Sequence, residues 1–222
     1  MSGRMMLRLH YHPTDASMLP HIVLEELGVP FELLLVDKAA GAQRSPAYLK
    51  LNPNGKIPVL EDGALVLYET AAIALHLADG HADRHPQAAL VPPLGTPARA
   101  QLYKWLMWCT NTLQAEMLLY FYPQRWADTP DAQAALKAKA EARIAGMVDQ
   151  LDAELARHGG PWLLGDAYSI VDPFVLMLCH WTRHMARPAS TLPHLGPYLR
   201  RLLARPAVRR AYVTEGIELP AA

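Results

Sequence analysis

The stretch from 51 to 70 contains residues whose types and spacing suit the binding of a short peptide. Turn-forming residues at 52–55 lead into Ile57 and Pro58. A proline within a strand indicates a sheet edge or a bend, and a cis Ile57-Pro58 bond is one way to make the bend. Such a bend would leave the N–H and C=O of Ile57 outside the sheet, where an extended peptide could pair with them.

A helix that begins at Thr70 supplies the second half of this arrangement. The Thr70 hydroxyl and the unpaired N–H groups of the first turn suit a carboxylate, and Glu69 beside them suits an ammonium group. A peptide edge, an anion site and a carboxylate together predict a site for a small zwitterionic peptide. Simpler interpretations exist for the parts: Thr70 as a helix cap, and Pro58 as a device that protects a sheet edge.

The residues before this stretch predict a βαβ unit. A strand at 5–11 has alternating apolar residues, a helix is expected at 18–27, and the nearly all-apolar strand at 31–36 is typical of a buried parallel strand. Ser17 is placed to cap the helix, and Gly28 is placed to end it.

A tight hairpin, with strands at 57–60 and 64–67, and the helix at 70–79 complete a thioredoxin-like layout. We therefore expect the first domain, an α/β domain, to span residues 1–80.

The rest of the chain has a different pattern. The stretch at 81–97 is rich in proline and predicts a linker. Beyond it the apolar residues have helical spacing, first over 99–120, and Ser169 with Asp172 forms a capping box before a later helix. We therefore expect an all-helical domain at 98–222.

Composition places the chain among ordinary globular proteins. Lys and Arg together number 21, as do Asp and Glu, so no charge pattern for nucleic acid or a membrane surface is present. No apolar run is long enough to span a bilayer, and the N-terminus lacks the pattern of a signal peptide, so a cytoplasmic protein is expected. Cys109 and Cys179 are expected to be buried free thiols, and the scattered histidines indicate no metal site.

The motif Asn-Pro-x-Gly-Lys-Ile-Pro-x-Leu, followed by Leu-Tyr-Glu-Thr-x-Ala-Ile, resembles the glutathione-binding half of the cytosolic glutathione S-transferases. The resemblance implies the architecture of these enzymes, an α/β thioredoxin-like domain followed by an all-α domain. It also implies glutathione as the co-substrate and no metal. In the family, the residue before a cis proline pairs with the cysteinyl backbone of glutathione, and a Glu-Ser pair holds its γ-glutamyl end. The resemblance therefore implies glutathione-binding roles for Ile57, Pro58, Glu69 and Thr70, with Lys56 and Gln43 near the glycine end.

Conjugation by glutathione needs a thiolate. A free thiol has a pKa of about 8.5, so at neutral pH it is mostly protonated. The N-terminus of the helix at 18–27 favours negative charge, and a hydroxyl donor aimed at the sulfur would add to this effect. The candidate donors are Tyr11, Thr14 and Ser17. Each has an alternative role: Ser17 as a plain helix cap, Thr14 as a loop residue and Tyr11 as part of the core.

The stretch at 20–28 is most similar to the bacterial beta class, with two departures. Ala16 stands where that class has a cysteine, so mixed-disulfide chemistry through the protein is not expected. Gln114 stands where it has a histidine. The acceptor pocket is expected between the loop at 12–17 and the first helix after the linker. Helical spacing assigns Met107, Asn111 and Gln114 to one face of that helix, and Trp108 is a further candidate for the lining, with a place in the core as its alternative role.

The resemblance implies a glutathione transferase, which attacks a hydrophobic electrophile or a peroxide with the bound thiolate. Two alternatives remain open: a non-catalytic glutathione-binding or protein-interaction module on the same fold, and a glutathione-dependent disulfide reductase. A homodimer is also implied.

Overall fold

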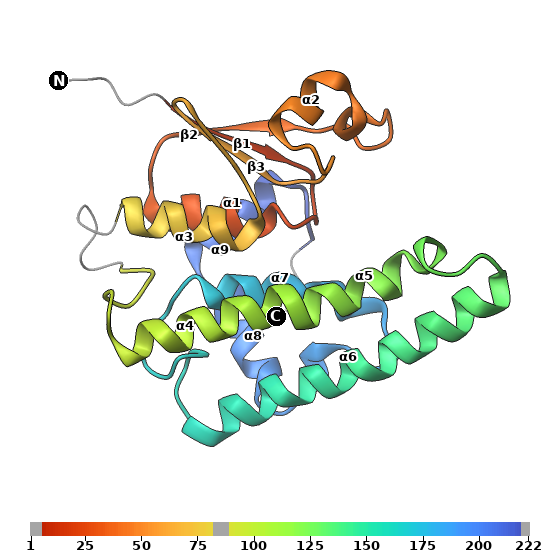
Figure 1. Cartoon of the computed structure of the whole chain (residues 1–222). Coiled ribbons are helices and arrows are strands. Elements are labelled where there is room, and N and C mark those ends of the chain that lie inside the picture. The colour runs from red at the N-terminus through yellow and green to blue at the C-terminus, as the bar shows by residue number, and fades with distance from the viewer. Residues whose placement is uncertain (1–5, 82–88, 219–222) are drawn as a thin grey trace. The chain divides into compact units, whose positions relative to one another are not determined.

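The fold is given by a computed structural model that describes residues 6–81 and 89–218 (Figure 1). Within this part of the chain, contacts divide the protein into two units. The first unit is drawn from residues 1–91 and 203–222, and the second from residues 92–202.

The first unit is built on a four-stranded mixed sheet in the order β2-β1-β3-β4. β1 (Leu7–Tyr11) pairs in parallel with β2 (Phe31–Leu35) and antiparallel with β3 (Val59–Asp62). β4 (Leu65–Tyr68) pairs antiparallel with β3 and forms the other edge. Leu9, in the middle of β1, is completely buried, so the apolar side chains of the central strand form the middle of the core.

The β3–β4 hairpin is closed by a two-residue turn, because Asp62 pairs with Leu65. Gly63 takes the first turn position with φ of 63°, the positive value that tight hairpin turns require and that glycine adopts without a steric penalty. β3 begins at Val59, so Pro58 lies immediately before the strand and removes no hydrogen bond from the ladder.

Two expectations about the sheet are wrong. β2 was expected to be buried, but it is an edge strand, and Leu35 is 62% exposed. Pro58 does not protect an edge, because β3 lies between β1 and β4. A short apolar run does not reveal its position in the sheet, since the order of strands depends on pairings between distant segments.

Three helices of the first unit pack together. α1 (Met18–Leu27) packs against both α3 (Thr70–Gly80) and α9 (Pro206–Thr214), and Figure 1 shows α1 and α3 along one face of the sheet. Gly28 ends α1 in the left-handed conformation, as the sequence predicts. Burial of Ile22 and other apolar side chains of α1 joins these helices to the sheet.

A further short helix, α2 (Pro46–Leu51), follows the 3-10 turn η1 (Ala42–Arg44) and was not expected from the sequence. The Ser45 hydroxyl accepts the Tyr48 N–H at 3.2 Å and caps the helix, which has proline in its first turn. Tyr48 belongs to a small second core, with the buried side chains Val36 and Val59. This core fixes α2 beside the start of β3.

The second unit is helical in the part that the structure describes; residues 82–88 of the expected linker lie outside that part. Its α-helices are α4 (Pro97–Trp108), α5 (Ala115–Phe121), α6 (Pro130–His158), α7 (Val171–Trp181) and α8 (Leu195–Leu203). Short turns of 3-10 helix are η4 (Pro123–Arg125), η5 (Thr182–His184) and η6 (Ala189–Thr191). None of the helices among the described residues is both long and apolar enough to cross a membrane.

The buried helix α7 is held at its start by Asp172. Its carboxylate accepts hydrogen bonds from the Leu163 N–H at 2.9 Å, the Ser169 N–H at 2.7 Å and the Tyr198 hydroxyl at 2.8 Å. The bond to the Ser169 N–H is one half of the expected capping box; the Ser169 hydroxyl turns to the same carboxylate instead of capping the helix. Cys109 and Cys179 are buried free thiols, as predicted.

The C-terminal segment differs from the expected domain division, which assigned residues 98–222 to the helical domain. The described residues from 203 onward group with the first unit, because α9 packs on α1. Arg205 binds Glu26 of α1 through two hydrogen bonds of 2.6 and 2.9 Å. Ion pairs between segments so far apart leave no periodic pattern in the sequence.

Candidate active site

The ends of the strands bring the candidate residues of the first unit together. Val59 pairs with Tyr68, so the residues before β3 and those after β4 leave the sheet at the same end. His10 also pairs with Val59, which places the loop after β1 at that end as well. The peptide edge, the start of α3 and the loop at 12–17 therefore meet at one end of the sheet, which satisfies the geometric requirement for a single site.

The turn at 52–55 is fixed by its own hydrogen bonds. The side-chain oxygen of Asn52 accepts the Asn54 N–H at 3.0 Å, and its main-chain oxygen accepts the Gly55 N–H at 2.9 Å. Gly55 has φ of 58°, and a Cβ atom there would lie only 3.0 Å from the Gln43 carbonyl oxygen. Any other residue at this position would therefore be strained.

Two side chains orient the residue before the peptide edge. The Lys56 carbonyl accepts one hydrogen bond from Asn52 Nδ2 at 2.8 Å and another from the Tyr48 hydroxyl at 3.0 Å. Burial, and secondarily the negative charge of Asp15, raises the pKa of Tyr48, so the phenol remains a neutral donor. The side chain of Lys56 is exposed.

The Ile57–Pro58 peptide bond is cis. Ile57 is half-buried and lies outside the strands. No backbone–backbone hydrogen bond found in the described part of the chain uses its N–H or C=O. These two groups are the donor and the acceptor that an added peptide strand would need.

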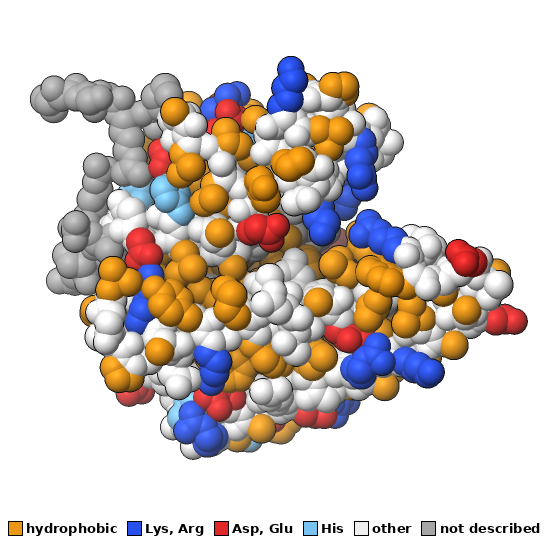
Figure 2. Space-filling model, in the orientation of Figure 1, with side chains coloured by type: hydrophobic (Ala, Val, Ile, Leu, Met, Phe, Trp, Pro, Cys, Tyr) orange, Lys and Arg blue, Asp and Glu red, His pale blue; other side chains and the backbone are white. Residues whose placement is uncertain are grey.

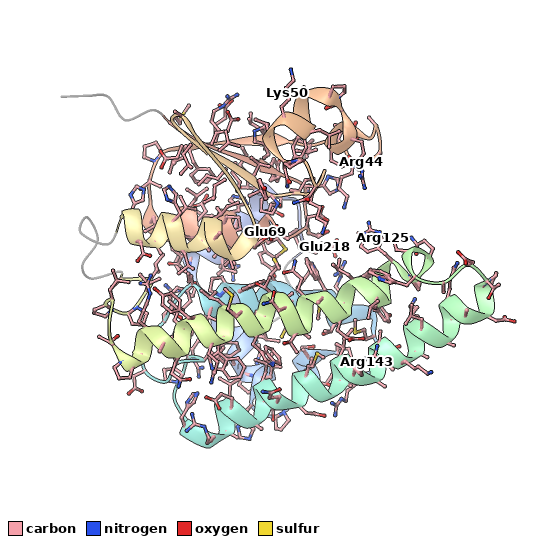
Figure 3. The ribbon with its side chains drawn as sticks, in the orientation of Figure 1. Arg44, Lys50, Glu69, Arg125, Arg143 and Glu218 are labelled. Carbon is pink, nitrogen blue, oxygen red and sulfur yellow. The ribbon has the colours of Figure 1, made fainter. Side chains whose placement is uncertain are left out.

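The start of α3 has an unusual backbone. Glu69 has φ of 76° and ψ of 112°, a conformation that costs a residue other than glycine about 1–3 kcal/mol. Its side chain is exposed (Figure 3) and forms no ion pair with the described residues. Such strain at the junction of β4 and α3 is typical of a functional position.

Thr70 is the first residue of α3, and the cap position belongs to Glu69. Its interpretation as a helix cap is therefore wrong. The residue is 7% exposed, and its hydroxyl bonds to no group in the described residues. A hydroxyl beside the unpaired N–H groups of the first helical turn is a suitable site for an anion.

The loop at 12–17 uses Ser17 in a way that the sequence did not reveal. The Ser17 side chain is buried; its hydroxyl donates to the His12 carbonyl at 3.0 Å and accepts the His12 N–H at 3.2 Å. It makes no capping bond to α1, so the cap prediction is wrong. The single hydrogen of the hydroxyl is used within the loop.

Of the other two hydroxyl candidates, Tyr11 lies just before this loop and Thr14 lies within it. Tyr11 is the last residue of β1, and its carbonyl accepts the Val36 N–H at 2.9 Å. Thr14 has φ of 65°, and its N–H donates to Glu215 Oε2 at 3.1 Å. Both side chains are half-buried. Lys38 binds the Asp15 carboxylate of this loop at 2.8 and 3.0 Å.

Arg44 is a candidate that the sequence analysis missed. A Cβ atom on Gly55 would lie 3.2 Å from Arg44 Cδ and 3.4 Å from Nη1, so this side chain lies over the turn. Figure 3 shows Arg44 projecting from the η1 end of α2, and Figure 2 shows basic side chains on this side of the unit. Gln43 Oε1 is buried without a hydrogen-bond partner in the described residues. In the sequence, this role of Arg44 could have been inferred from its place directly after Gln43.

The acceptor candidates belong to the second unit. The segment η3 (Cys109–Gln114), between α4 and α5, is π-helical and contains Asn111 and Gln114. Hydrogen bonds in a π-helix span five residues instead of four, so α-helical counting from Met107 does not carry through this segment. Met107 is 46% exposed, and Trp108 makes an edge contact with the buried Trp105 at 5.3 Å between ring centroids. Their part in an acceptor pocket stays a prediction.

No group of three or more His, Cys, Asp or Glu side chains within the described residues is placed to hold a metal ion.

A thioredoxin-like α/β domain followed along the chain by helices, with a peptide edge beside a helix start, defines the class of the glutathione transferases. Residues 17–79 match the family model described as "Glutathione S-transferase, N-terminal domain", and residues 131–205 match "Glutathione S-transferase, C-terminal domain". The chain belongs to the glutathione S-transferase family of enzymes.

Individual relatives align with this chain over most of its length. Glutathione S-transferase GstA of Escherichia coli O157:H7 is 29% identical over 216 residues, which cover 96% of this chain and 100% of that protein. Glutathione S-transferase 3 of Zea mays is 33% identical, covering 85% of this chain and 84% of that protein. A crystal structure of a glutathione transferase homologue from Sulfitobacter, with bound glutathione, has a TM-score of 0.83 at 28% identity and covers 96% of this chain and 99% of that one.

Proposed function

We propose that this protein binds glutathione at the end of the sheet where β3 begins and β4 ends, and transfers it as a thiolate to a hydrophobic electrophile. The pairing of Val59 with Tyr68 carries this proposal, because it brings the unpaired backbone of Ile57 and the start of α3 to one place. The Sulfitobacter structure contains bound glutathione, which supports the choice of peptide.

The middle of the tripeptide would pair with the main chain. The N–H and C=O of Ile57 would bond to the cysteinyl backbone of glutathione as an added strand does. Pro58 places no N–H in competition for the ligand. This contact fixes the cysteine at the sheet end and orients its sulfur toward the loop at 12–17.

The two ends of glutathione carry different charged groups, and each end matches one side of the site. The γ-glutamyl carboxylate would bind the Thr70 hydroxyl and the first N–H groups of α3, and the γ-glutamyl ammonium would pair with Glu69. The glycine carboxylate would lie beside Lys56 and Arg44, with Gln43 nearby. Three contacts with distinct charges would discriminate the tripeptide from other thiols.

The thiolate would be stabilised at the start of α1. The helix dipole favours a negative charge there, and a hydroxyl donor would stabilise it further. We take Thr14 of the loop at 12–17 as the donor, because the single hydrogen of the Ser17 hydroxyl is already donated to the His12 carbonyl, and Tyr11 stays the alternative. The sulfur would then attack an electrophilic carbon, form the C–S bond and expel the leaving group with its electron pair, while the thiol proton passes to solvent.

The candidate acceptor contacts are Met107, Trp108, Asn111 and Gln114, whose apolar and amide side chains would suit hydrophobic electrophiles. Peroxides are a second class of acceptor for the same thiolate. Ala16 places no thiol in the loop, so a disulfide reductase would have to act through glutathione alone. We also propose a homodimer in the cytoplasm, by analogy with the family.

The experiment measures glutathione binding by calorimetry and then turnover of a chromogenic aryl halide, an organic hydroperoxide and a small disulfide. We expect binding and turnover of the aryl halide. Binding without turnover of any of the three would identify a glutathione-binding module, and turnover of the disulfide alone would identify a reductase. Absence of binding would refute the proposal.

A further inference from the structure

Glu215 is a buried carboxylate at the end of α9 that contacts the loop between β1 and α1. It lies 201 positions along the chain from Thr14, yet both belong to the first unit. We propose that Glu215 is a positioning residue, which holds Thr14 in the conformation that directs its hydroxyl to the glutathione sulfur. This inference rests on the proposed function.

The carboxylate has one partner for each oxygen. Oε2 accepts the Thr14 N–H at 3.1 Å, and Oε1 lies 2.7 Å from Nδ1 of His21 in α1. The side chains of His21 and Glu215 are 0% and 1% exposed, so water does not compete for these bonds. Glu215 therefore connects the loop to α1 and α9.

Thr14 needs such support because of its backbone. Its φ of 65° is rare for a β-branched residue and strains the backbone. A hydrogen bond from the Thr14 N–H to a carboxylate is stronger than one to a neutral acceptor, so it can offset this strain. Without the bond, Thr14 would relax toward negative φ, and its side chain would point in a different direction.

The position of Glu215 is itself well fixed. Its N–H donates to the Ala211 carbonyl at 3.0 Å, and α9 is attached to α1 by the Arg205–Glu26 pair. The His21 ring makes edge contacts with Tyr11 at 6.4 Å between centroids and with Phe31 at 5.8 Å. The carboxylate is therefore held between elements that already pack together, as a support for a loop residue requires.

The test compares the wild type with Glu215→Gln, which keeps the size of the side chain but loses one of the two acceptors. The matched control is Glu26→Gln, which weakens an ion pair between the same two helices without contacting the loop. For each protein, kcat and KM for glutathione are measured with the aryl halide, together with the ultraviolet absorbance of the bound thiolate and the thermal midpoint.

We expect Glu215→Gln to lower kcat by about 10- to 100-fold, the size of effect that small misplacements produce. KM for glutathione should be unchanged, because Ile57 and Thr70 are untouched, and the thiolate absorbance should fall. Glu26→Gln should keep the wild-type kcat. An unchanged kcat in Glu215→Gln, or an equal loss of kcat in Glu26→Gln, would overturn the inference. The proposed function would still stand in that case, provided that the wild type turns over the aryl halide.

A double-mutant cycle tests whether Glu215 acts through Thr14. In a Thr14→Val background, Glu215→Gln should lower kcat little further, since the hydroxyl that it positions is already gone. If each substitution instead lowers kcat by the same factor in either background, so that the two fold-losses multiply, the inference is contradicted. If Glu215→Gln fails to fold, amide hydrogen exchange in the wild type replaces it: protection at Thr14 supports the bond to Glu215, and rapid exchange there refutes it. A wild type without glutathione turnover would refute the proposed function itself.

Discussion

Replacement of Thr70 by valine tests the proposed γ-glutamyl site most cleanly. The Thr70 hydroxyl has no hydrogen-bond partner among the described residues, so Thr70→Val removes no internal bond and preserves the shape of the side chain. A hydrogen bond to a charged group contributes about 1.5–3 kcal/mol. Since each 1.4 kcal/mol is about a tenfold change in Kd, glutathione should bind about 10- to 150-fold more weakly. Thr70→Ser, which keeps the hydroxyl, should bind as the wild type does.

The assay is calorimetry with two ligands, glutathione and the dipeptide cysteinylglycine, which lacks the γ-glutamyl group. Thr70→Val should weaken binding of glutathione but leave the dipeptide unaffected, so the coupling between residue and ligand group is measured directly. An equal effect on both ligands, or no effect on glutathione, would refute the assignment of Thr70 to the γ-glutamyl carboxylate.

Three other substitutions follow from the same contacts. Glu69→Gly should raise the thermal midpoint, because glycine adopts φ of 76° freely, and should weaken glutathione binding; a variant that loses stability would contradict this. Ser17→Ala should lower the free energy of unfolding, measured by urea denaturation, by about 1–3 kcal/mol, because the N–H and C=O of His12 both lose their partner. The folded variant should keep the wild-type kcat. A large loss of kcat would identify Ser17 as the donor to the sulfur. Burial raises the pKa of Asp172 from 3.8 to about 6, so the folded state binds this proton more tightly than the unfolded chain. Its contribution to stability is then largest below pH 4 and declines by about 3 kcal/mol between pH 4 and pH 6; denaturation across this range should show the decline in the wild type and not in Asp172→Asn.

The local parts of the first domain could be predicted from the sequence, because their signals lie within a few neighbouring residues. Gly28 ends α1 as expected, and the turn chemistry of Asn52 and Gly55 appears in the structure as hydrogen bonds and a positive φ. The order of Ile57, Pro58 and the later Thr70 was enough to predict a peptide edge beside a helix start.

The features that the sequence did not reveal depend on distant contacts. Ser17 occupies the cap position, but His12 competes for its hydroxyl, and propensity alone does not decide between the two partners. Glu215 reaches Thr14 only because α9 packs on α1. The π-helical segment η3 shifts the register between Met107 and Gln114, which regular helical counting assumes to be constant.

A crystal structure of the protein with glutathione would show whether the peptide edge at Ile57 binds the tripeptide. We expect the N–H and C=O of Ile57 both to bond to the cysteinyl backbone, within about 3.2 Å, and the γ-glutamyl carboxylate to lie at the start of α3. We also expect the sulfur within hydrogen-bond distance of the Thr14 hydroxyl. Glutathione bound elsewhere on the protein, with the Ile57 groups unused, would refute the proposed site.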